Sequence, residues 1–310
     1  MPDNEIELSV IGAANIDIIA RCVSKSVLRD SNIGKVERSF GGVGRNIVND
    51  CALLGIKAAF ISAAGNDGTT MSMMDDLIRA GVDISRVKMS PEYTTGTYVA
   101  IFDETGDMLC AVNDMSVTDY INREYLETVD IPGRIVALDS NLNTETLEYL
   151  TSVPGKVFFA DPVSVNKAGR LKGVLKHIDM IKPNIYEAEE LTGIAIEQEK
   201  DILAAGDKLL KEGIGTVCIT CGEKGVYVFS EKESFHAEAL RCDVVNANGA
   251  GDAFSAGMLY GMLRGLSLRR MCDFAQCCSA EALSSPGAIS PNLNENNVIE
   301  RMNRTIGRSI

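Results

Sequence analysis

The sequence predicts an α/β domain built around a mostly parallel sheet. Along the 310 residues, short apolar runs rich in β-branched side chains alternate with longer helix-like runs. Nearly continuous apolar strands of this kind are typical of a parallel sheet that helices cover on both faces. No long Gly- or Pro-rich linker divides the alternation, so we expect one domain over residues 1–310.

The expected elements follow one another along the chain. The candidate strands are "LSVIGA", "AAFISAAG", "RIVALDS", "KVFFAD", "MIKPN", "TVCITCG" and "GVYVFS". The candidate helices between them are "GRNIVNDCALLGI", "TTMSMMDDLIRAG", "NTETLEYLTSV", "YEAEELTGI" and "DILAAGDKLLKEGI".

Two stretches break this alternation and predict a second, smaller sheet. "SNIGKVERSF" and "TGTYVAIFDETGDMLCAVND" carry strand and turn patterns without a helix between them. In the second stretch, "DETGDM" is typical of a loop that joins the two strands of a hairpin. We therefore expect segments at about 18–43 and 94–115 to form a small β sheet over one edge of the large one.

Composition excludes several classes of protein. The formal net charge is −13 and no strong basic stretch offsets it, which argues against a nucleic-acid partner. No apolar run is long enough to span a bilayer, and the first ten residues are acidic, so we expect no membrane segment or signal peptide. Nine scattered cysteines without a disulfide framework favour reduced thiols and a cytoplasmic protein.

The most informative motif is "NANGAGDAFSAG", which stands just before a helix-like run. Gly249, Ala250 and Gly251 leave the backbone accessible, and the N–H groups at a helix N-terminus favour an anion. The carboxylate of Asp252 would repel that anion. We interpret Asp252 as a base that takes a proton from a nucleophile attacking a bound phosphate.

Two motifs near the N-terminus suit a sugar-like ligand. Asn15 and Asp17 are expected to end a strand two residues apart, so both side chains point to one face and can bind hydroxyl groups. A turn-capping pair is the alternative. "GGVGRN", which begins at Gly41, allows close backbone approach to a ligand or serves as a plain strand-to-helix turn. It fits neither the Walker A loop nor the dinucleotide fingerprint.

Two further motifs each have a binding and a structural interpretation. Asn184 and Glu187 are three residues apart in a first helical turn, where they can hold Mg²⁺ through water or form a capping box. "TCGEKG", at 220–225, follows a strand and can hold nucleotide phosphates or form a hairpin turn.

Taken together, the motifs "NID", "GGVGRN", "NIYE", "TCGEKG" and "GAGD" occur in an order that resembles the ribokinase-like, or PfkB-type, carbohydrate kinases over essentially the whole chain. The resemblance implies a three-layer α/β/α domain with a β lid. It also implies a phosphotransferase with an alcohol acceptor, ATP and Mg²⁺ as cofactors, a small nucleoside or sugar as substrate, and a homodimer formed through the lid.

The resemblance implies a role for each matching residue. Asp252 matches the catalytic base, and the amides of Gly249, Ala250 and Gly251 match the anion hole. The implied substrate-binding residues are Asn15, Asp17, Gly41, Gly42, Arg45, Asn46, Thr97 and Asn113. The implied nucleotide-binding residues are Asn184, Glu187, Thr220, Gly222, Gly225 and Asn248, of which Asn184 and Glu187 also hold the magnesium ion through water.

One position departs from the family pattern. The family commonly reads Asp-Thr-x-Gly-Ala-Gly-Asp, whereas this chain has Asn246 and Ala247 in place of the first two residues. In the family the lost aspartate often helps to bind a monovalent cation. We therefore expect little activation by K⁺, although "SSPGAIS" at 284–290 still offers carbonyl and hydroxyl oxygens.

Within the family, stretches including "SNIGK", "GGVGRNI", "TGDMLCAVNDM" and "ADPVS" resemble the branch that phosphorylates the 5′-hydroxyl of pseudouridine. Asn113 is then expected to read the base, with Thr95 and Thr97 on the same face; the alternative is that Asn113 and Asp114 simply end a strand. Ribose or another nucleoside is the alternative substrate, and a non-catalytic nucleoside sensor is the alternative from another class.

Overall fold

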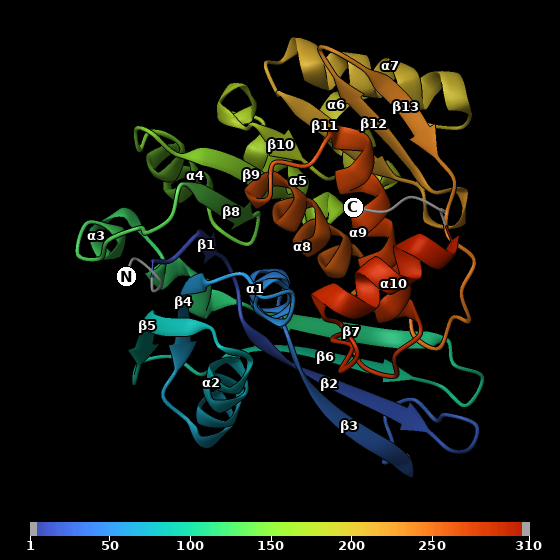
Figure 1. The fold of residues 1–310 in the computed structure, drawn as a ribbon. Coiled ribbons are helices and arrows are strands. Elements are labelled where there is room, and N and C mark those ends of the chain that lie inside the picture. Colours follow the sequence, from blue (N-terminus) through green and yellow to red (C-terminus); the bar gives the residue numbers. More distant parts are fainter. Residues whose placement is uncertain (1–4, 306–310) are drawn as a thin grey trace.

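A computed structural model of the chain describes residues 5–305 and contains two sheets. The large sheet has the strand order β13-β12-β11-β10-β9-β8-β1-β4-β5 (Figure 1). From β5 to β11 all neighbours pair in parallel, and β12 and β13 are added antiparallel, which confirms the mostly parallel sheet. Its strands are β1 (Leu8–Ile11), β4 (Ala58–Gly65), β5 (Asp83–Ser90), β8 (Ile135–Asp139), β9 (Val157–Asp161), β10 (Met180–Ile181), β11 (Thr216–Thr220), β12 (Val226–Ser230) and β13 (Ser234–Ala237).

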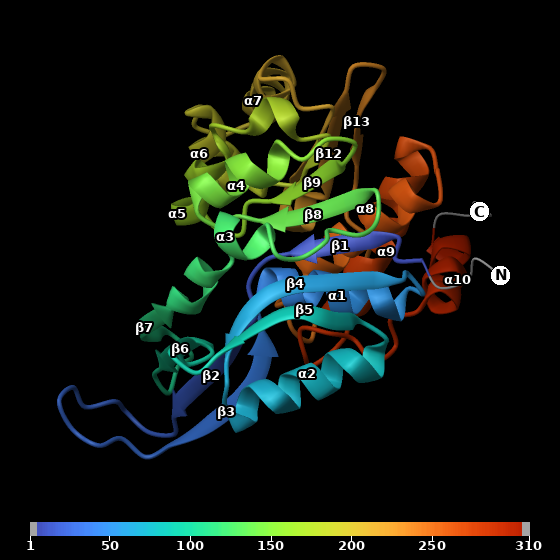
Figure 2. The ribbon, with the colours of Figure 1, turned by 90° about the vertical axis from the view of Figure 1, so that its left-hand side faces the viewer.

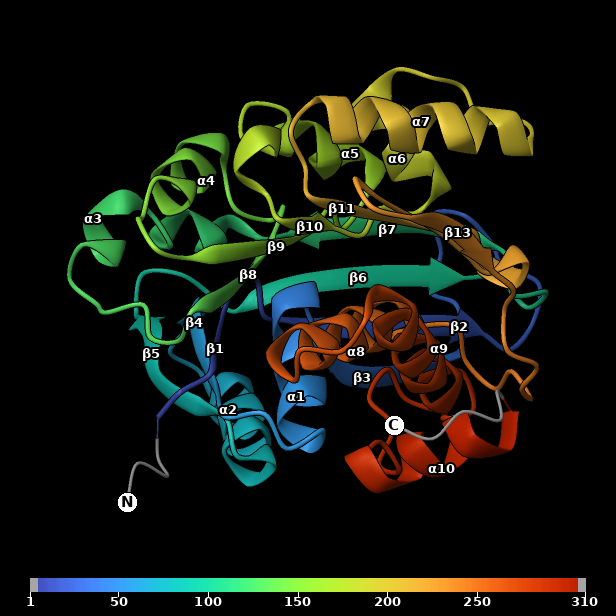
Figure 3. The same cartoon turned by 45° about the horizontal axis from the view of Figure 1, so that its top comes forward.

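Helices cover both faces of this sheet and complete three layers (Figure 3). One layer contains α1 (Val43–Leu53), α2 (Gly68–Ala80), α8 (Ala250–Leu263), α9 (Leu268–Leu283) and α10 (Glu295–Thr305). The other contains α3 (Arg123–Leu126), α4 (Thr144–Thr151), α5 (Val165–Ala168), α6 (Ile185–Thr192) and α7 (Glu199–Lys211). Short 3₁₀ turns lie at Ser116–Tyr120, Gly169–Leu171, Leu175–His177 and Gly222–Lys224. Among the described helices, none has the length and apolar character needed to cross a membrane.

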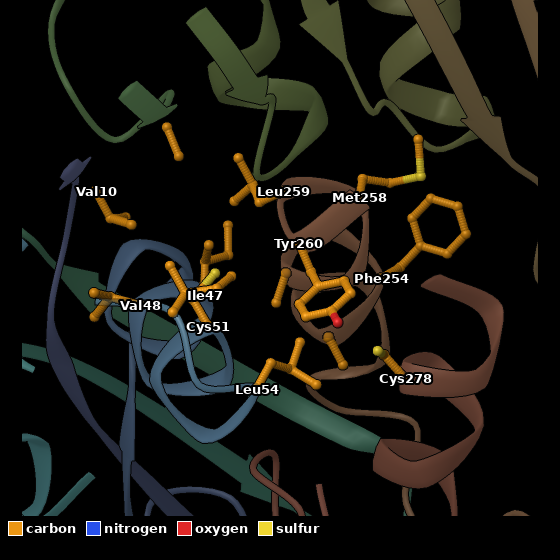
Figure 4. Packing of buried hydrophobic residues seen from close by; sticks show 14 of the residues in the cluster. Val10, Ile47, Val48, Cys51, Leu54, Phe254, Met258, Leu259, Tyr260 and Cys278 are labelled. Carbon is orange, nitrogen blue, oxygen red and sulfur yellow. The ribbon is translucent and has the colours of Figure 1, made fainter. Parts of the chain in front are cut away.

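Alternate residues of the central strands supply two separate hydrophobic cores. Val136 and Phe158 point to the layer of α3–α7, whereas Ala137 and Phe159 point to the layer of α1 and α8. This alternation follows from the two-residue repeat of a strand, and it explains why the strands are apolar throughout. Figure 4 shows the core that lies between α1 and the helices α8 and α9. Helix α1 contributes residues such as Ile47 to it.

The small sheet has the strand order β3-β2-β6-β7 and stands apart from the large one (Figure 2). Its strands are β2 (Asn15–Cys22), β3 (Gly34–Gly41), β6 (Gly96–Phe102) and β7 (Met108–Asp114). The β6–β7 pair is antiparallel, which confirms the predicted hairpin. Strand β2 pairs antiparallel with β3 and parallel with β6.

The crossing from the large sheet to the small one corrects one prediction. Asn15 and Asp17 do not end a strand of the large sheet; β1 ends at Ile11, and the two residues begin β2 of the small sheet. The chain changes sheets at Gly12, where a side chain would overlap the carboxylate of Asp139. That carboxylate accepts hydrogen bonds from the backbone N–H of Ala13 and of Gly44, each at 2.9 Å.

The close approach of α8 to α9 generates a stability prediction. A Cβ at Gly257 of α8 would lie 2.5 Å from the Cα of Ala275 in α9, so Gly257→Ala must push the helices apart. We expect a loss of about 1–3 kcal/mol in the free energy of unfolding, measured by urea denaturation. Gly68→Ala at the start of α2 is the matched control, since nothing lies within 4 Å of the added methyl group. Equal stability of the two variants would contradict this packing.

Candidate active site

The glycine motif forms the N-terminus of α8. Gly249 precedes the helix with a φ of 81°, a left-handed conformation that favours glycine, and a side chain there would overlap the carbonyl of Ala288. The first N–H groups of a helix have no intrahelical partner, so those of Gly249 to Gly251 can bind an anion. Asp252 follows in the same first turn.

Asp252 is bonded to the N-terminal half of the chain. The Nδ2 of Asn46, on α1, donates to Oδ2 of Asp252 at 2.8 Å. The opposite end of the same amide is fixed as well, because NH1 of Arg45 donates to Oδ1 of Asn46 at 3.1 Å. The predicted pair Asn46 and Asp252, 206 residues apart in sequence, therefore meets in one polar cluster.

Arg45, which was predicted to bind the substrate, is buried beside Asn46. Its side chain is 4% exposed and forms an ion pair with Asp76 of α2 at 2.6 Å. The guanidinium also lies over the ring of Phe40. Arg45 thus helps to position Asn46, and its contact with a substrate stays a prediction.

The surroundings of Asp252 shift its ionisation toward neutral pH. Burial, together with the nearby carboxylates of Asp161 and Asp139, raises the pKa of Asp252 to about 7. The hydrogen bond from Asn46 and the charge of Lys182 act in the opposite direction. A carboxylate with a pKa near the working pH can both accept and release a proton, as a general base requires.

Three charged residues of this cluster were missed by the sequence analysis. Lys182 Nζ lies 3.0 Å from Oδ2 of Asp161, and both side chains are buried. Ser255 of α8 donates to the same oxygen at 3.0 Å. Asp139 and Asp161 end neighbouring strands β8 and β9, and Lys182 follows β10. The sequence does contain a signal that could have identified these residues. Each stands at the end of an apolar run, in "VALDS", "FFAD" and "MIKPN".

A cavity of about 690 Å³ opens beside the N-terminus of α8. Its size suits a nucleotide-sized ligand. Apolar side chains such as Val226, Leu240 and Phe254 line it. The sequence-predicted residues that it brings together are Asn184, Thr220, Gly222, Gly225, Ala250 and Gly251. The segment at 220–225 forms the hairpin turn between β11 and β12, and its role in binding nucleotide phosphates stays a prediction.

Asn248 is not among the residues that line this cavity. Its backbone N–H donates to Oδ1 of Asn246 at 3.0 Å, and Nδ2 of Asn246 donates to the carbonyl of Pro286 at 2.9 Å. The two bonds fix the orientation of the Asn246 amide. An N–H donor therefore bonds to one of the carbonyl oxygens that "SSPGAIS" was expected to offer to a cation.

Asn184 and Glu187 form the capping box of α6. The backbone N–H of Glu187 donates to Asn184 Oδ1 at 2.9 Å, and that of Asn184 donates to Glu187 Oε2 at 2.8 Å. Burial raises the pKa of Glu187, and the neighbouring Asp161 adds to this shift. One carboxylate oxygen, Oε1, stays outside the capping box. Within residues 5–305 no cluster of three His, Cys, Asp or Glu residues could hold a metal.

The small sheet carries polar residues on one face. Residues directly opposite in neighbouring strands share a face. Asp17 is opposite Tyr98, and Tyr98 is opposite Asn113, so these three form one row. Asn15 Nδ2 donates to Oδ1 of Asp17 at 2.6 Å, and burial raises the pKa of Asp17.

The strand register corrects the expectation for Thr97. Thr97 is opposite Ile16 and Asp114, which places it on the other face of the small sheet from Asn113. Thr95 is buried and donates to Oδ2 of Asp67 at 2.8 Å, so its hydroxyl is already engaged. Thr95 also precedes β6, which begins at Gly96. The two threonines therefore do not line the same face as Asn113.

Two predicted glycines lie where the small sheet meets α1. Gly42 has a φ of 97°, and a Cβ there would lie 2.8 Å from the Cα of Ala14. A side chain at Gly41 would overlap the carboxylate of Asp17. The glycines therefore let the start of α1 approach the polar residues of β2.

The fold of this chain is shared with solved ribokinases. A ribokinase from Arabidopsis thaliana solved with ribose and ATP has the same fold, with a TM-score of 0.82 at 21% identity, over 96% of this chain and 99% of that one. A carbohydrate kinase from Agrobacterium tumefaciens gives a TM-score of 0.83 at 25% identity, over 97% and 98% of the two chains.

Residues 5–295 match the family model described as "pfkB family carbohydrate kinase". Over 296 residues the chain is 34% identical to pseudouridine kinase from Escherichia coli (strain K12), which covers 94% of each protein. The chain belongs to the pfkB family of carbohydrate kinases, which are phosphotransferases acting on sugars and nucleosides.

The polar cluster generates a titration prediction. The carboxyl of Asp252 should titrate with a midpoint near 7 when followed by carbon-13 NMR of labelled aspartate. Asn46→Ala removes a hydrogen bond that stabilises the ionised form, so the midpoint should move to higher pH. Asn49→Ala, one helical turn further on, is the control and should leave it unchanged. A wild-type midpoint near the ordinary value of about 3.9 would contradict this electrostatic description.

Proposed function

We propose that the protein is an ATP-dependent kinase that phosphorylates the 5′-hydroxyl of pseudouridine. The hydrogen bond between Asn46 and Asp252 is the observation that carries this proposal. It joins the helix N-terminus beside the nucleotide-sized cavity to the strand-to-helix segment that borders Asp17. A carboxylate able to accept a proton is thus held between a phosphate-binding element and a hydroxyl-binding one.

The proposed reaction uses Asp252 as the general base. The ionised carboxylate accepts the proton of the 5′-hydroxyl as that oxygen attacks the γ-phosphorus in line, and the bond from phosphorus to the β,γ-bridging oxygen breaks to release ADP. The N–H groups of Gly249, Ala250 and Gly251 stabilise the charge on the transferring group. Positioning and electrostatics supply most of the acceleration, as is usual in phosphoryl transfer.

Magnesium fits this site only through water. The capping box leaves one oxygen of Glu187, and Asn184 uses its own oxygen as a cap, so a direct protein cage is absent from the described residues. Mg²⁺ commonly keeps several waters and binds mainly to substrate phosphates. Glu187 would hold such a water, and the ion would neutralise charge on the nucleotide.

We also propose that catalysis is independent of potassium. The Asn246 amide already bonds to the Pro286 carbonyl and to the Asn248 N–H. These bonds fix the loop before Gly249 without an added cation. The use of ATP, together with nine free cysteines, supports a cytoplasmic setting.

The small sheet supports a nucleoside rather than a simple sugar. Asp17 and Asn113 share a face with one strand between them, so their side chains start roughly 10 Å apart. A ribose near Asp17 would leave its base near Asn113 once the sheet closes as a lid. The 34% identity to pseudouridine kinase favours pseudouridine among the nucleosides. Ribose and other nucleosides are the alternatives.

The opposite face of the lid supports a homodimer. Val36, Ile101 and Val112 lie on that face and are 64%, 36% and 66% exposed. Contiguous exposed apolar side chains on a sheet mark an interaction surface. We propose a second copy of this chain as the partner, with the two lids in contact.

Asp252→Asn tests the base. The variant retains the shape of the side chain and loses proton acceptance, so kcat should fall about 10²–10⁴-fold in a coupled ADP-release assay, with ATP affinity little changed. Asp207→Asn on the exposed side of α7 is the control and should keep normal turnover. Near-normal turnover of Asp252→Asn would remove the base assignment. Complete loss of ATP binding would indicate a structural role instead.

A substrate panel of pseudouridine, uridine, ribose and fructose tests the acceptor. Pseudouridine carries one more ring N–H than uridine, so a site with an acceptor for it should prefer pseudouridine. Asn113→Ala should cost about 1–3 kcal/mol in kcat/KM with pseudouridine and much less with ribose. Asp114→Ala, on the other face, is the control. Equal losses on both substrates, or a preference for uridine, would leave only a sugar or nucleoside kinase of unspecified substrate. No turnover of any acceptor would favour the nucleoside sensor.

A further inference from the structure

Lys182 is a buried cation for which the proposed reaction has no role. Its side chain is 8% exposed, and within residues 5–305 it forms an ion pair with Asp161. A lysine ammonium has three N–H donors, so one partner at 3.0 Å leaves two for another group. Burying such a group is costly unless its charge is used or fully paired.

The ammonium lies against the N-terminus of α8. A Cβ built at Gly251 would lie 3.2 Å from Lys182 Nζ, and Gly251 also lines the nucleotide-sized cavity. The glycine therefore leaves no side chain between the ammonium and the first turn of the helix. A cation beside the positive end of a helix dipole is unfavourable by itself, and an anion bound between the two would reverse that.

The surroundings keep Lys182 charged. Burial lowers the pKa of Lys182, but the carboxylates of Asp161, Glu187 and Asp252 outweigh this effect and raise it. Asp161 is itself fixed, because Ser255 Oγ donates to Oδ2 and the Val163 N–H donates to Oδ1, each at 3.0 Å. The ammonium is thus held in one place by a rigid partner.

We propose that Lys182 binds the terminal phosphates of the nucleotide from beneath Gly251, and that Asp161 and Ser255 position it. The inference rests on the proposed nucleotide site and not on the identity of the acceptor. Lys182 and the amides of the α8 N-terminus then face the same phosphoryl group from two sides. The ammonium supplies a fixed positive charge that needs no reorganisation during transfer.

Nucleotide affinity tests this role without requiring turnover. Calorimetry would compare a non-hydrolysable ATP analogue with AMP, which has the base and ribose but lacks the terminal phosphates. Lys182→Met should weaken binding of the ATP analogue about 10- to 100-fold, the usual effect of losing a hydrogen bond from a charged group. Binding of AMP should change less than about twofold, since AMP does not reach Lys182.

Two further variants separate a loss of phosphate binding from a loss of stability. Lys182→Met leaves Asp161 buried without its cation, so the double variant Lys182→Met/Asp161→Asn removes both charges and should restore stability but not affinity for the ATP analogue. Lys172→Met is the matched control, because Lys172 also pairs with a carboxylate, Glu190 at 2.8 Å, but is half-exposed at the surface. It should bind both nucleotides as the wild type does.

The outcomes separate this inference from the proposed function. If the folded double variant loses affinity equally for the ATP analogue and for AMP, or loses affinity for neither, the role of Lys182 is overturned. If the wild type phosphorylates pseudouridine and the ratio of the affinities for the ATP analogue and AMP does not change in the variants, only the role of Lys182 fails. If no acceptor is phosphorylated but the ratio falls as expected, the inference stands and the proposed function fails.

Discussion

The carboxylate of Asp139 is the constraint on which the arrangement of the site depends. It ends β8 and accepts backbone hydrogen bonds from Ala13, Gly44 and Asn141, each at 2.9 Å. Ala13 belongs to the segment that leaves the large sheet for the small one, and Gly44 belongs to the first turn of α1. One buried side chain therefore fixes where the polar start of β2 and the helix bearing Asn46 meet. Burial raises the pKa of Asp139, and the three N–H donors oppose that shift.

The charges near Asp252 explain how the site can combine acid–base chemistry with anion binding. Carboxylates at the ends of β8 and β9, together with burial, raise the pKa of Asp252 to about 7. Lys182 opposes this shift and pairs with Asp161, and its positive charge lies beside Gly251 at the helix N-terminus. The cation and the helix amides make the same region attractive to an anion.

Much of the site could be predicted because its residues act through local geometry. Gly249 needs its left-handed conformation, and Asp252 follows in the first turn of the helix, both of which depend on a few adjacent residues. Asn184 and Glu187 likewise form their capping box within one turn. Other predictions failed where the answer depended on distant segments. Thr97 was placed on the wrong face because strand register depends on pairing with β2 and β7. The ion pair of Arg45 with Asp76 could not be predicted either, because Asp76 lies on another helix.

The sequence by itself determined the alternation of strands and helices, the hairpin of the small sheet and the glycine-rich start of α8, since apolar periodicity and glycine placement act over short distances. Only the tertiary structure decided which buried charges meet. The contact of Asn46 with Asp252 spans 206 residues, and the pair of Asp161 with Lys182 joins the ends of adjacent strands. Neither contact has a local signature, because the order of strands in a sheet depends on how the whole chain packs. The sequence specifies the chemistry of each side chain, whereas the balance of their charges depends on the distances that the fold sets between them.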